Sequence, residues 1–200
     1  MGEVDSGTTE GLLPAREGVG PLLQRDYWAA VRGAKLRPSE VATELRAHFA
    51  SFVPSELAAF SHPEGGGLLE VGDELEISIA GAGDCKVRVV HCDAQSLTLA
   101  TAVGHPEAGR ITFGAYRDDR GALVVHIRSR ARSDSFLRLI GFLIVGEAMQ
   151  TNTWTHFISR VAAFAGGEVE DRIHAEMGSI DGDDGEEDVL DQPTFLARND

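Results

Sequence analysis

The sequence predicts an α+β protein in which a curved antiparallel sheet wraps around a long C-terminal helix. Strand-like segments between residues 74 and 128 alternate apolar and polar side chains, as in a sheet with one buried and one wet face. Two short helical segments precede them. The stretch 133–164 is helical in character and apolar enough to fill the concave side of the sheet. At about 1.5 Å per residue, roughly 30 residues make a helix of about 45 Å.

The chain begins with a predicted flexible arm and a first strand. Residues 1–20 are rich in Gly, Glu and Thr and show no hydrophobic periodicity, which is typical of a flexible segment. The stretch 24–34 contains Tyr27, Trp28 and Val31, residues that favour a strand.

Two short helices are expected after this strand. Arg37-Pro38-Ser39-Glu40 places a proline and an acidic residue in a first turn, which is typical of a helix start. Apolar residues at helical spacing then continue to Phe52. Pro54-Ser55-Glu56 opens a second predicted helix over 57–60, and Pro63 ends it.

In the strands that follow, every second residue is expected to face the last helix. The expected inward positions are Leu75, Ile77, Ile79, Val87, Val89, His91, Leu97, Leu99, Thr101, Ile111, Phe113, Ala115, Leu123, Val125 and Ile127. Asp118-Asp119-Arg120-Gly121 is expected to form the hairpin turn between the last two strands.

The predicted C-terminal helix has clear start and stop signals. Ser133-Asp134-Ser135 can cap its N-terminus, and Gly166-Gly167 ends it. From 168 to 200 the chain holds 12 acidic and 2 basic residues, which predicts an acidic disordered tail. Residues 21–167 are therefore expected to form a single α+β domain.

The net charge, the hydrophobic runs and the two cysteines limit the partners and the cellular compartment that are expected. A net charge of −14 argues against nucleic-acid binding, which needs a basic face. No stretch resembles a signal peptide, and the most apolar run, 136–145, contains Arg138 and is too short to span a membrane. Cys85 and Cys92 are expected to be free thiols in a reducing, cytoplasmic compartment. Their spacing of seven places them on opposite faces of a regular strand.

The order of elements resembles the helix-grip fold of START-type and Bet v 1-type proteins. The resemblance implies an apolar cavity between the sheet and the last helix. An α+β sandwich without a cavity has the same sequence pattern.

The loop Gly104-His105-Pro106-Glu107-Ala108-Gly109, followed by a strand with Phe113, resembles the signature of the uncharacterised DUF1990 (UPF0548) family. Val71-Gly72 before a strand and Gln150 in the last helix are consistent with it. The family's Tyr-Gly-Thr-Leu before the loop is Leu-Ala-Thr-Ala here, and its acidic pair after the loop is Arg-Ile. The family has no established activity, so the resemblance implies no mechanism.

This loop concentrates polar side chains in an otherwise apolar region. His105 could act as an acid–base group near neutral pH, Glu107 could orient it, and Arg110 could bind a carboxylate or phosphate. The same residues are also good turn formers, and a histidine there can simply cap backbone groups. The loop is therefore either part of a cavity mouth or only a strand connector.

Three other positions are candidates for a site in the predicted cavity. His91 falls in the apolar phase of its strand, so it is expected to point toward the last helix. Glu147, Gln150 and Trp154 follow one another at helical spacing, and a buried Glu147 could serve as acid or base. Each also has an ordinary structural interpretation as a core or surface contact.

The polar phase of the strands contains a basic stripe. Its members are Arg88, Arg110, His126, Arg128 and Arg130. They are expected on the outer sheet face, paired across strands with Glu74 and Glu76. The acidic tail could dock on this stripe. No metal-ligand pair, phosphate loop or nucleophile elbow occurs in the sequence, so no metal or cofactor is expected.

Three functions remain open from the sequence. The first is binding of a small apolar or amphipathic molecule between the sheet and the last helix. The second is a cyclase, dehydratase or hydrolase that uses the same cavity, with His105, His91 or Glu147 as the acid–base group. The third is an interaction module that recruits a protein partner through residues 168–200.

Overall fold

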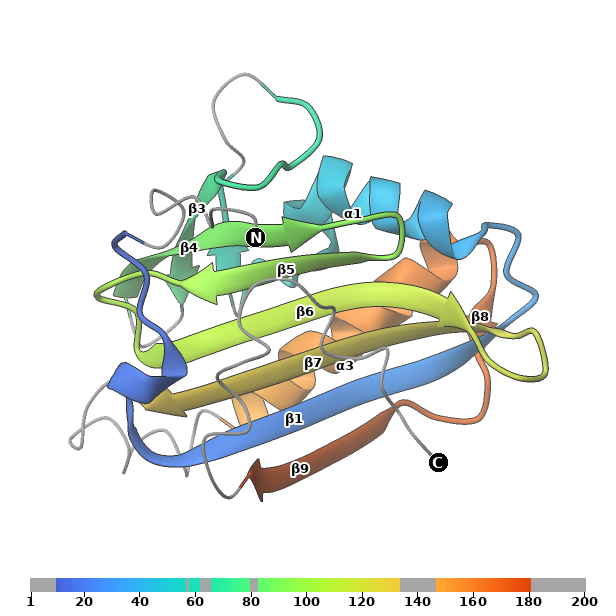
Figure 1. Cartoon of the computed structure of the whole chain (residues 1–200). Coiled ribbons are helices and arrows are strands. Elements are labelled where there is room, and N and C mark those ends of the chain that lie inside the picture. The colour runs from blue at the N-terminus through green and yellow to red at the C-terminus, as the bar shows by residue number, and fades with distance from the viewer. Residues whose placement is uncertain (1–9, 57, 62–65, 80–82, 134–146, 181–200) are drawn as a thin grey trace, which may run out of the picture.

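The computed structural model describes residues 10–56, 58–61, 66–79, 83–133 and 147–180, and for 147–150 the backbone alone. Nine strands form one antiparallel sheet in the order β2-β3-β4-β5-β6-β7-β1-β8, and β9 also pairs with β1 (Figure 1). The strands are β1 Val19–Arg32, β2 Ala58–Phe60, β3 Glu74–Ile79, β4 Gly83–Cys92, β5 Ser96–Thr101, β6 Glu107–Arg117, β7 Leu123–Ser133, β8 Glu168–Val169 and β9 His174–Ile180.

In the described part of the chain, two α-helices pack on one side of this sheet (Figure 1). The first, α1 Pro38–Phe52, begins at the predicted start signal, where the backbone N–H of Arg37 donates to the Glu40 carboxylate at 2.7 Å. The second, α3 Glu147–Phe164, is the predicted C-terminal helix, and Gly166 follows it with a φ of 76°. Its predicted first part, 134–146, lies outside the described residues. The curved sheet and the C-terminal helix confirm the predicted fold class.

The alternation of side chains gives the sheet two distinct faces. The helix face carries Tyr27, Phe113 and Ile127 and packs against α1 and α3. The outer face carries the intervening residues, such as Thr112 and His126. The hairpin turn after β6 also forms as predicted, because the Gly121 N–H donates to the Asp118 carbonyl at 2.8 Å.

Aromatic side chains from three elements form the centre of the core. Phe49 of α1, Phe113 of β6 and Phe157 of α3 are fully buried. The ring centroids of Phe49 and Phe113 are 4.8 Å apart, and those of Phe113 and Phe157 are 5.1 Å apart. Rings at such distances contribute packing energy beyond the area that they bury. This cluster fixes both helices against β6.

The second short helix predicted for 57–60 is wrong. Residues Ala58–Phe60 form strand β2, which pairs with Ile77–Ile79 at the outer edge of β3. The edge of β3 has unpaired backbone groups, and a short segment that follows α1 gains hydrogen bonds by lying along it. A segment this short has too few residues for its own helix to be stable.

The boundaries predicted for the domain also need correction at both ends. Residues 168–180 do not belong to a disordered tail, because β8 and β9 pair with β1. The predicted arm, 1–20, is ordered from residue 10 onward in the described part, and Leu12 forms a β-bridge with Ala102. Within the described residues, the folded unit thus begins at residue 10 and ends at residue 180.

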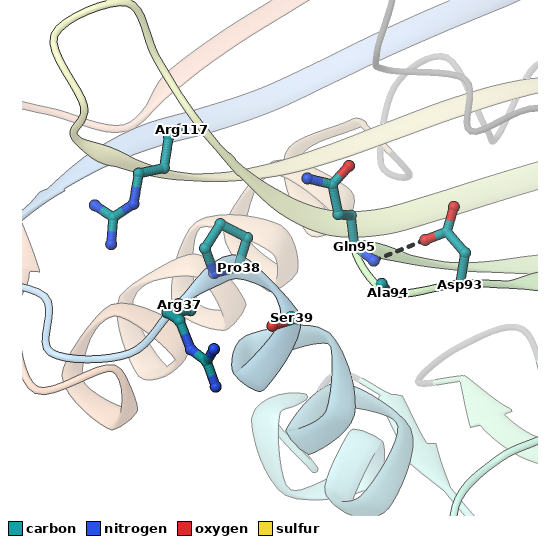
Figure 2. A pocket seen from close by; sticks show the side chains of 7 residues that line it. All are labelled: Arg37, Pro38, Ser39, Asp93, Ala94, Gln95 and Arg117. Carbon is teal, nitrogen blue, oxygen red and sulfur yellow. Dashed lines mark hydrogen bonds between the residues drawn. The ribbon is translucent and has the colours of Figure 1, made fainter.

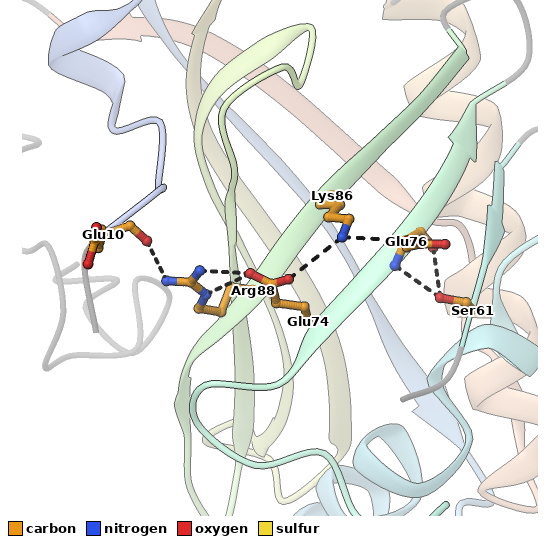
Figure 3. A network of polar contacts seen from close by, with 6 residues as sticks. All are labelled: Glu10, Ser61, Glu74, Glu76, Lys86 and Arg88. Atoms are coloured by element: carbon orange, nitrogen blue, oxygen red, sulfur yellow. Dashed lines mark hydrogen bonds and ion pairs between the residues drawn. The ribbon is translucent and has the colours of Figure 1, made fainter. Parts of the chain in front are cut away.

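A charged network at one edge of the outer face confirms part of the predicted pairing (Figure 3). Arg88 Nη2 lies 2.7 Å from Glu74 Oε1, and Lys86 Nζ lies 3.5 Å from Glu76 Oε1. Arg88 also donates to the backbone carbonyl of Glu10 at 2.7 Å, which ties the N-terminal segment to β4.

Candidate ligand-binding site

The helix face changes from apolar to polar along the three longest strands. One row across β1, β7 and β6 consists of Tyr27, Ile127 and Phe113. The next row consists of Arg25, Ser129 and Ile111. Further along, Glu107 lies opposite Ser133. The apolar part of this face lies under α3, and the polar part lies toward the end of β7.

A buried ion pair is the main feature of the polar part. Arg25 is only 2% exposed, and its Nη1 atom lies 3.7 Å from Oε1 of Glu107, whose side chain is 16% exposed. Burying a guanidinium on a sheet face is costly unless acceptors compensate for the lost water. Most positions on the helix face carry apolar side chains, whose burial has no such cost. Sheet formation alone therefore does not account for an arginine at position 25.

Two buried polar atoms lie on the helix side of the sheet, one beside Arg25 and the other on α3. Ser129 lies beside Arg25 in the same row and is 4% exposed. Its hydroxyl and the indole N–H of Trp154 have no hydrogen-bond partner among the described residues. Buried polar groups in native proteins are nearly always satisfied. Both atoms are therefore suited to bind a polar group of a ligand.

The aromatic side chains next to the polar part provide an apolar wall. The ring of Trp154 contacts Phe113 edge-on with centroids 5.3 Å apart, and it also lies 6.1 Å from the ring of Phe157. The Tyr27 hydroxyl lies 3.5 Å from the Thr151 hydroxyl on α3. The arrangement places an apolar region beside a charged one within one face, as in sites for amphipathic molecules.

The loop 104–109 folds back on itself. His105 is 7% exposed, and its Nδ1 atom accepts the N–H of Glu107 at 3.0 Å. Thr101 closes the base of the loop, since its hydroxyl accepts the N–H of Gly109 at 2.9 Å. Gly109 cannot be replaced, because a Cβ there would lie 2.2 Å from the Arg130 carbonyl oxygen. These contacts fit a strand connector that positions Glu107 opposite Arg25.

His91 points away from the sheet–helix space, which corrects its predicted orientation. A β-bulge between Val89 and His91 shifts the alternation of β4 by one residue. His91 now lies opposite Thr98 on the outer face, and its Nε2 atom is 3.2 Å from Asp93 Oδ2. The same bulge turns Cys92 toward the core, so both free cysteines pack against it rather than on opposite faces.

The candidates on α3 are only partly placed by the structure. Glu147 and Gln150 lie in the first turn of the helix, and their side chains are outside the described part. Trp154 is half-buried at the border of the aromatic cluster. Of the predicted site residues, Glu107 and Trp154 lie on the helix side of the sheet.

Arg110 belongs to the outer face, opposite Arg130 on β7. Nearby, Asp26 accepts hydrogen bonds from His126 at 2.7 Å and from Arg128. Burial alone would raise the pKa of the Asp26 carboxyl, but the hydrogen bonds from His126 and Arg128 lower this pKa to about 2. His126 and Arg128 are thus partners of a buried carboxylate and do not pair with Glu74 and Glu76.

An open cleft of about 500 Å³ lies elsewhere, at the N-terminus of α1 (Figure 2). Its lining residues are Arg37, Pro38, Ser39, Asp93, Ala94, Gln95 and Arg117. Its charged groups have partners within the protein: Arg37 pairs with Glu40, Arg117 donates to the Gly121 carbonyl, and Asp93 caps the turn before β5. This cleft is a weaker candidate than the helix face, because its charges stabilise local turns.

Sequence patterns missed the central residue of the site. Arg25 lies in the apolar phase of β1, between Leu23 and Tyr27. A charged residue within an apolar alternation is an available signal for a buried polar site. The first strand was predicted to begin at residue 24, whereas it begins at Val19. With Leu23 left out of the strand, the alternation of Leu23, Arg25 and Tyr27 was not recognised.

The described part of the chain contains neither a metal-binding cluster nor a membrane-spanning helix. No group of three His, Cys, Asp or Glu side chains there is placed to hold a metal ion. Within the same residues, no helix combines the length and the apolar character that crossing a membrane requires.

Several solved structures share this fold. A hypothetical protein from Helicobacter pylori superposes with a TM-score of 0.52 at 9% identity, over 70% of this chain and 86% of that one. A conserved protein from Geobacillus kaustophilus gives a TM-score of 0.50 at 9% identity, over 78% and 99%. The di-domain ARO/CYC StfQ from the steffimycin biosynthetic pathway gives 0.51 at 12% identity, over 76% of this chain and 52% of StfQ.

No protein-family model matches the chain, and no curated protein matches it. The identities to solved structures are so low that these likenesses concern the fold alone. The chain therefore has a helix-grip fold, with a curved antiparallel sheet packed against a C-terminal helix.

Proposed function

We propose that the protein binds a small amphipathic molecule between the helix face of the sheet and α3. The observation that carries this proposal is the buried pair of Arg25 and Glu107 beside Ser129, on a face that is otherwise apolar. A guanidinium binds carboxylate or phosphate oxygens through two parallel hydrogen bonds. The ligand therefore has an acidic group for Arg25 and an apolar body for the half-buried ring of Trp154.

Binding is favoured over catalysis by the positions of the acid–base candidates. His105 is engaged by its own loop, and His91 faces the outer side beside Asp93. An enzyme that used the helix face of the sheet would have to depend on Glu147 or on groups that the sequence did not suggest. StfQ, one protein of the same fold, is an ARO/CYC protein by name. The resemblance of the loop 104–109 to the DUF1990 family adds no activity to this comparison.

The fluorescent anion 1-anilinonaphthalene-8-sulfonate tests the proposal with the full-length chain. Its sulfonate and aromatic rings match the expected polar and apolar halves of the site. We expect one saturable site, with affinity lowered about tenfold or more in Arg25→Met and about fivefold in Ser129→Ala. Ser129→Ala removes one oxygen, so it keeps the fold even if Arg25→Met is unstable.

Arg120→Met is the matched control, since Arg120 is 75% exposed and lies in the β6–β7 turn. It removes the same charge and should leave the affinity unchanged. The proposal is overturned if the unmodified protein shows no saturable site, or if all three variants bind with the same affinity as the unmodified protein. Near-ultraviolet circular dichroism of each variant verifies that probe binding does not report unfolding.

A further inference from the structure

The ion pair between Arg25 and Glu107 brings a carboxylate of the protein itself to the candidate ligand site. The Nη1 atom of Arg25 lies 3.7 Å from Oε1 of Glu107. This distance exceeds the about 2.7–2.9 Å of a direct hydrogen bond between such groups. The contact between these two atoms is therefore one of charge attraction, and an anionic group of a ligand can replace an attraction of this kind.

Arg25 and Glu107 differ in their freedom to move. Arg25 is 2% exposed, whereas the Glu107 side chain is 16% exposed. Two anions beside one buried guanidinium repel each other strongly, because little water screens them. When the acidic group of a ligand reaches Arg25, Glu107 is therefore the group that has to leave, since its side chain can turn toward solvent.

The loop 104–109 is held in place at its base. The Thr101 hydroxyl accepts the Gly109 N–H at 2.9 Å, and it donates to the Leu13 carbonyl at 2.9 Å. The Leu13 N–H in turn donates to the Thr101 carbonyl at 2.8 Å. Thr101 thus links the base of the loop to residues 10–18, which form an N-terminal strap.

The N-terminal strap also contacts the chain directly after the loop (Figure 1). Its short helix η1, Ala15–Glu17, packs on β6 and β7. Gly18 follows, and a Cβ on Gly18 would lie 3.0 Å from the Cβ of Ala108, the neighbour of Glu107. The strap therefore fastens the loop on both sides and limits how far Glu107 can withdraw.

We propose that Glu107 is an internal competitor of the ligand: it occupies Arg25 in the empty protein, and an acidic ligand displaces it against the hold of the N-terminal strap. This inference rests on the proposed function and adds a means of regulating it. The strap sets the affinity of the site, because every contact that keeps Glu107 beside Arg25 opposes the binding of an external anion. By reciprocity, ligand binding loosens the loop 104–109.

Two substitutions test the competition with 1-anilinonaphthalene-8-sulfonate and the full-length protein. Glu107→Gln keeps the shape of the side chain and removes its charge, so we expect the affinity to rise about fivefold or more. Thr101→Val changes no charge but removes the hydroxyl that ties the loop to the strap, and it should raise the affinity about threefold. Thr101→Ser keeps that hydroxyl and should show the affinity of the unmodified protein.

Each substitution has a matched control. Glu70→Gln removes one charge from an exposed side chain that precedes β3. Thr98→Val removes another buried hydroxyl of β5, one that bonds to Thr112 instead of the loop. Both controls should leave the affinity unchanged.

The inference is overturned if Glu107→Gln or Thr101→Val binds the probe with unchanged or lower affinity. It is also overturned if a control variant, or Thr101→Ser, shows the same rise. In each of these cases saturable binding still supports the proposed function. Absence of a saturable site in the unmodified protein overturns the proposed function and this inference together.

Discussion

The two faces of the sheet use the same strands in different ways. On the helix face, burial is achieved with Phe113, Ile127 and other apolar side chains, and charge is confined to the end that holds Arg25 and Glu107. On the outer face, several buried residues are polar, and Thr112 and His126 each bond to a neighbouring side chain. One face is stabilised by apolar packing and the other by satisfied hydrogen bonds.

This difference between the two faces indicates which of them is the better candidate for a ligand-binding site. Thr112 and His126 on the outer face have side-chain partners, so their burial is accounted for without a ligand. The polar end of the helix face includes Ser129 and Trp154, whose polar atoms lack hydrogen-bond partners in the part of the chain that the structure describes. Groups that the fold does not need for its own stability are the better candidates for binding a ligand.

Phe113→Ala should give the largest effect and would test the apolar character of the helix face. It removes a fully buried ring that contacts Phe49, Phe157 and Trp154. We expect the free energy of unfolding to fall by about 3–5 kcal/mol, measured by urea denaturation. A loss below about 1 kcal/mol would mean that the helix face is loosely packed at its centre.

Asp26→Asn tests whether a buried ionic network stabilises the outer face. The folded-state pKa of Asp26 is about 2, below the 3.8 of an ordinary aspartate. Stability from this shift is therefore present above about pH 4 and is lost as the pH falls toward 2. At pH 7 we expect the variant to lose about 2 kcal/mol of unfolding free energy.

The pH profile separates this effect from a general loss of packing. Urea denaturation of both proteins between pH 7 and pH 3 should show the difference shrinking below pH 4. A difference that is constant across this range would contradict the assignment to the Asp26 carboxylate.

Thr98→Val tests the hydrogen-bonded character of the outer face by leaving one hydroxyl without its partner. The hydroxyls of Thr98 and Thr112 lie 2.9 Å apart, and both residues are buried. The single variant should lose about 1–3 kcal/mol, because the Thr112 hydroxyl stays buried and unsatisfied. The double variant with Thr112→Val should be more stable than the single one. If calorimetry shows the two losses simply adding, the pair is not a coupled hydrogen bond.

Arg88→Ala should give the smallest effect, since it removes a pair at the margin of the outer face. Arg88 is 17% exposed and Glu74 is 41% exposed. Pairs with this exposure contribute below about 1 kcal/mol, and salt weakens them. A thermal-melting comparison with Glu74→Gln in low and high salt measures this contribution. A loss well above that of the Asp26 variant would reverse the order expected for the two regions.

Much of the fold could be predicted from side-chain alternation, because strands of a half-buried sheet repeat every two residues. The alternation assigned Phe113 and Ile127 to the helix face and Arg110 and Arg128 to the outer face, as the structure has them. His91 was assigned wrongly, since one extra residue in a bulge inverts every later position in that strand.

The remaining parts of the fold and of the candidate site depend on contacts between residues far apart in the chain. No local sequence pattern contains such contacts. Residues 174–180 look like a solvated acidic segment, yet they form β9 because the edge of β1 offers unpaired backbone groups. The site itself depends on Arg25 meeting Glu107, two residues far apart in the chain that only the sheet register brings together. The sequence suggested Glu107 through its loop, with His105 as its partner instead of Arg25.

The central place of β1 has a consequence for synthesis of the protein on the ribosome. Its pairing with β7 joins residues such as Asp26 and His126, which are 100 residues apart in the chain. At a synthesis rate of about 5–20 residues per second, β1 waits roughly 5–20 s for its first neighbour, and longer for β9. During this interval its strand edges and Tyr27 are exposed to other chains. The nascent protein is therefore most prone to aggregation before β7 emerges, and a binding chaperone would act in that interval.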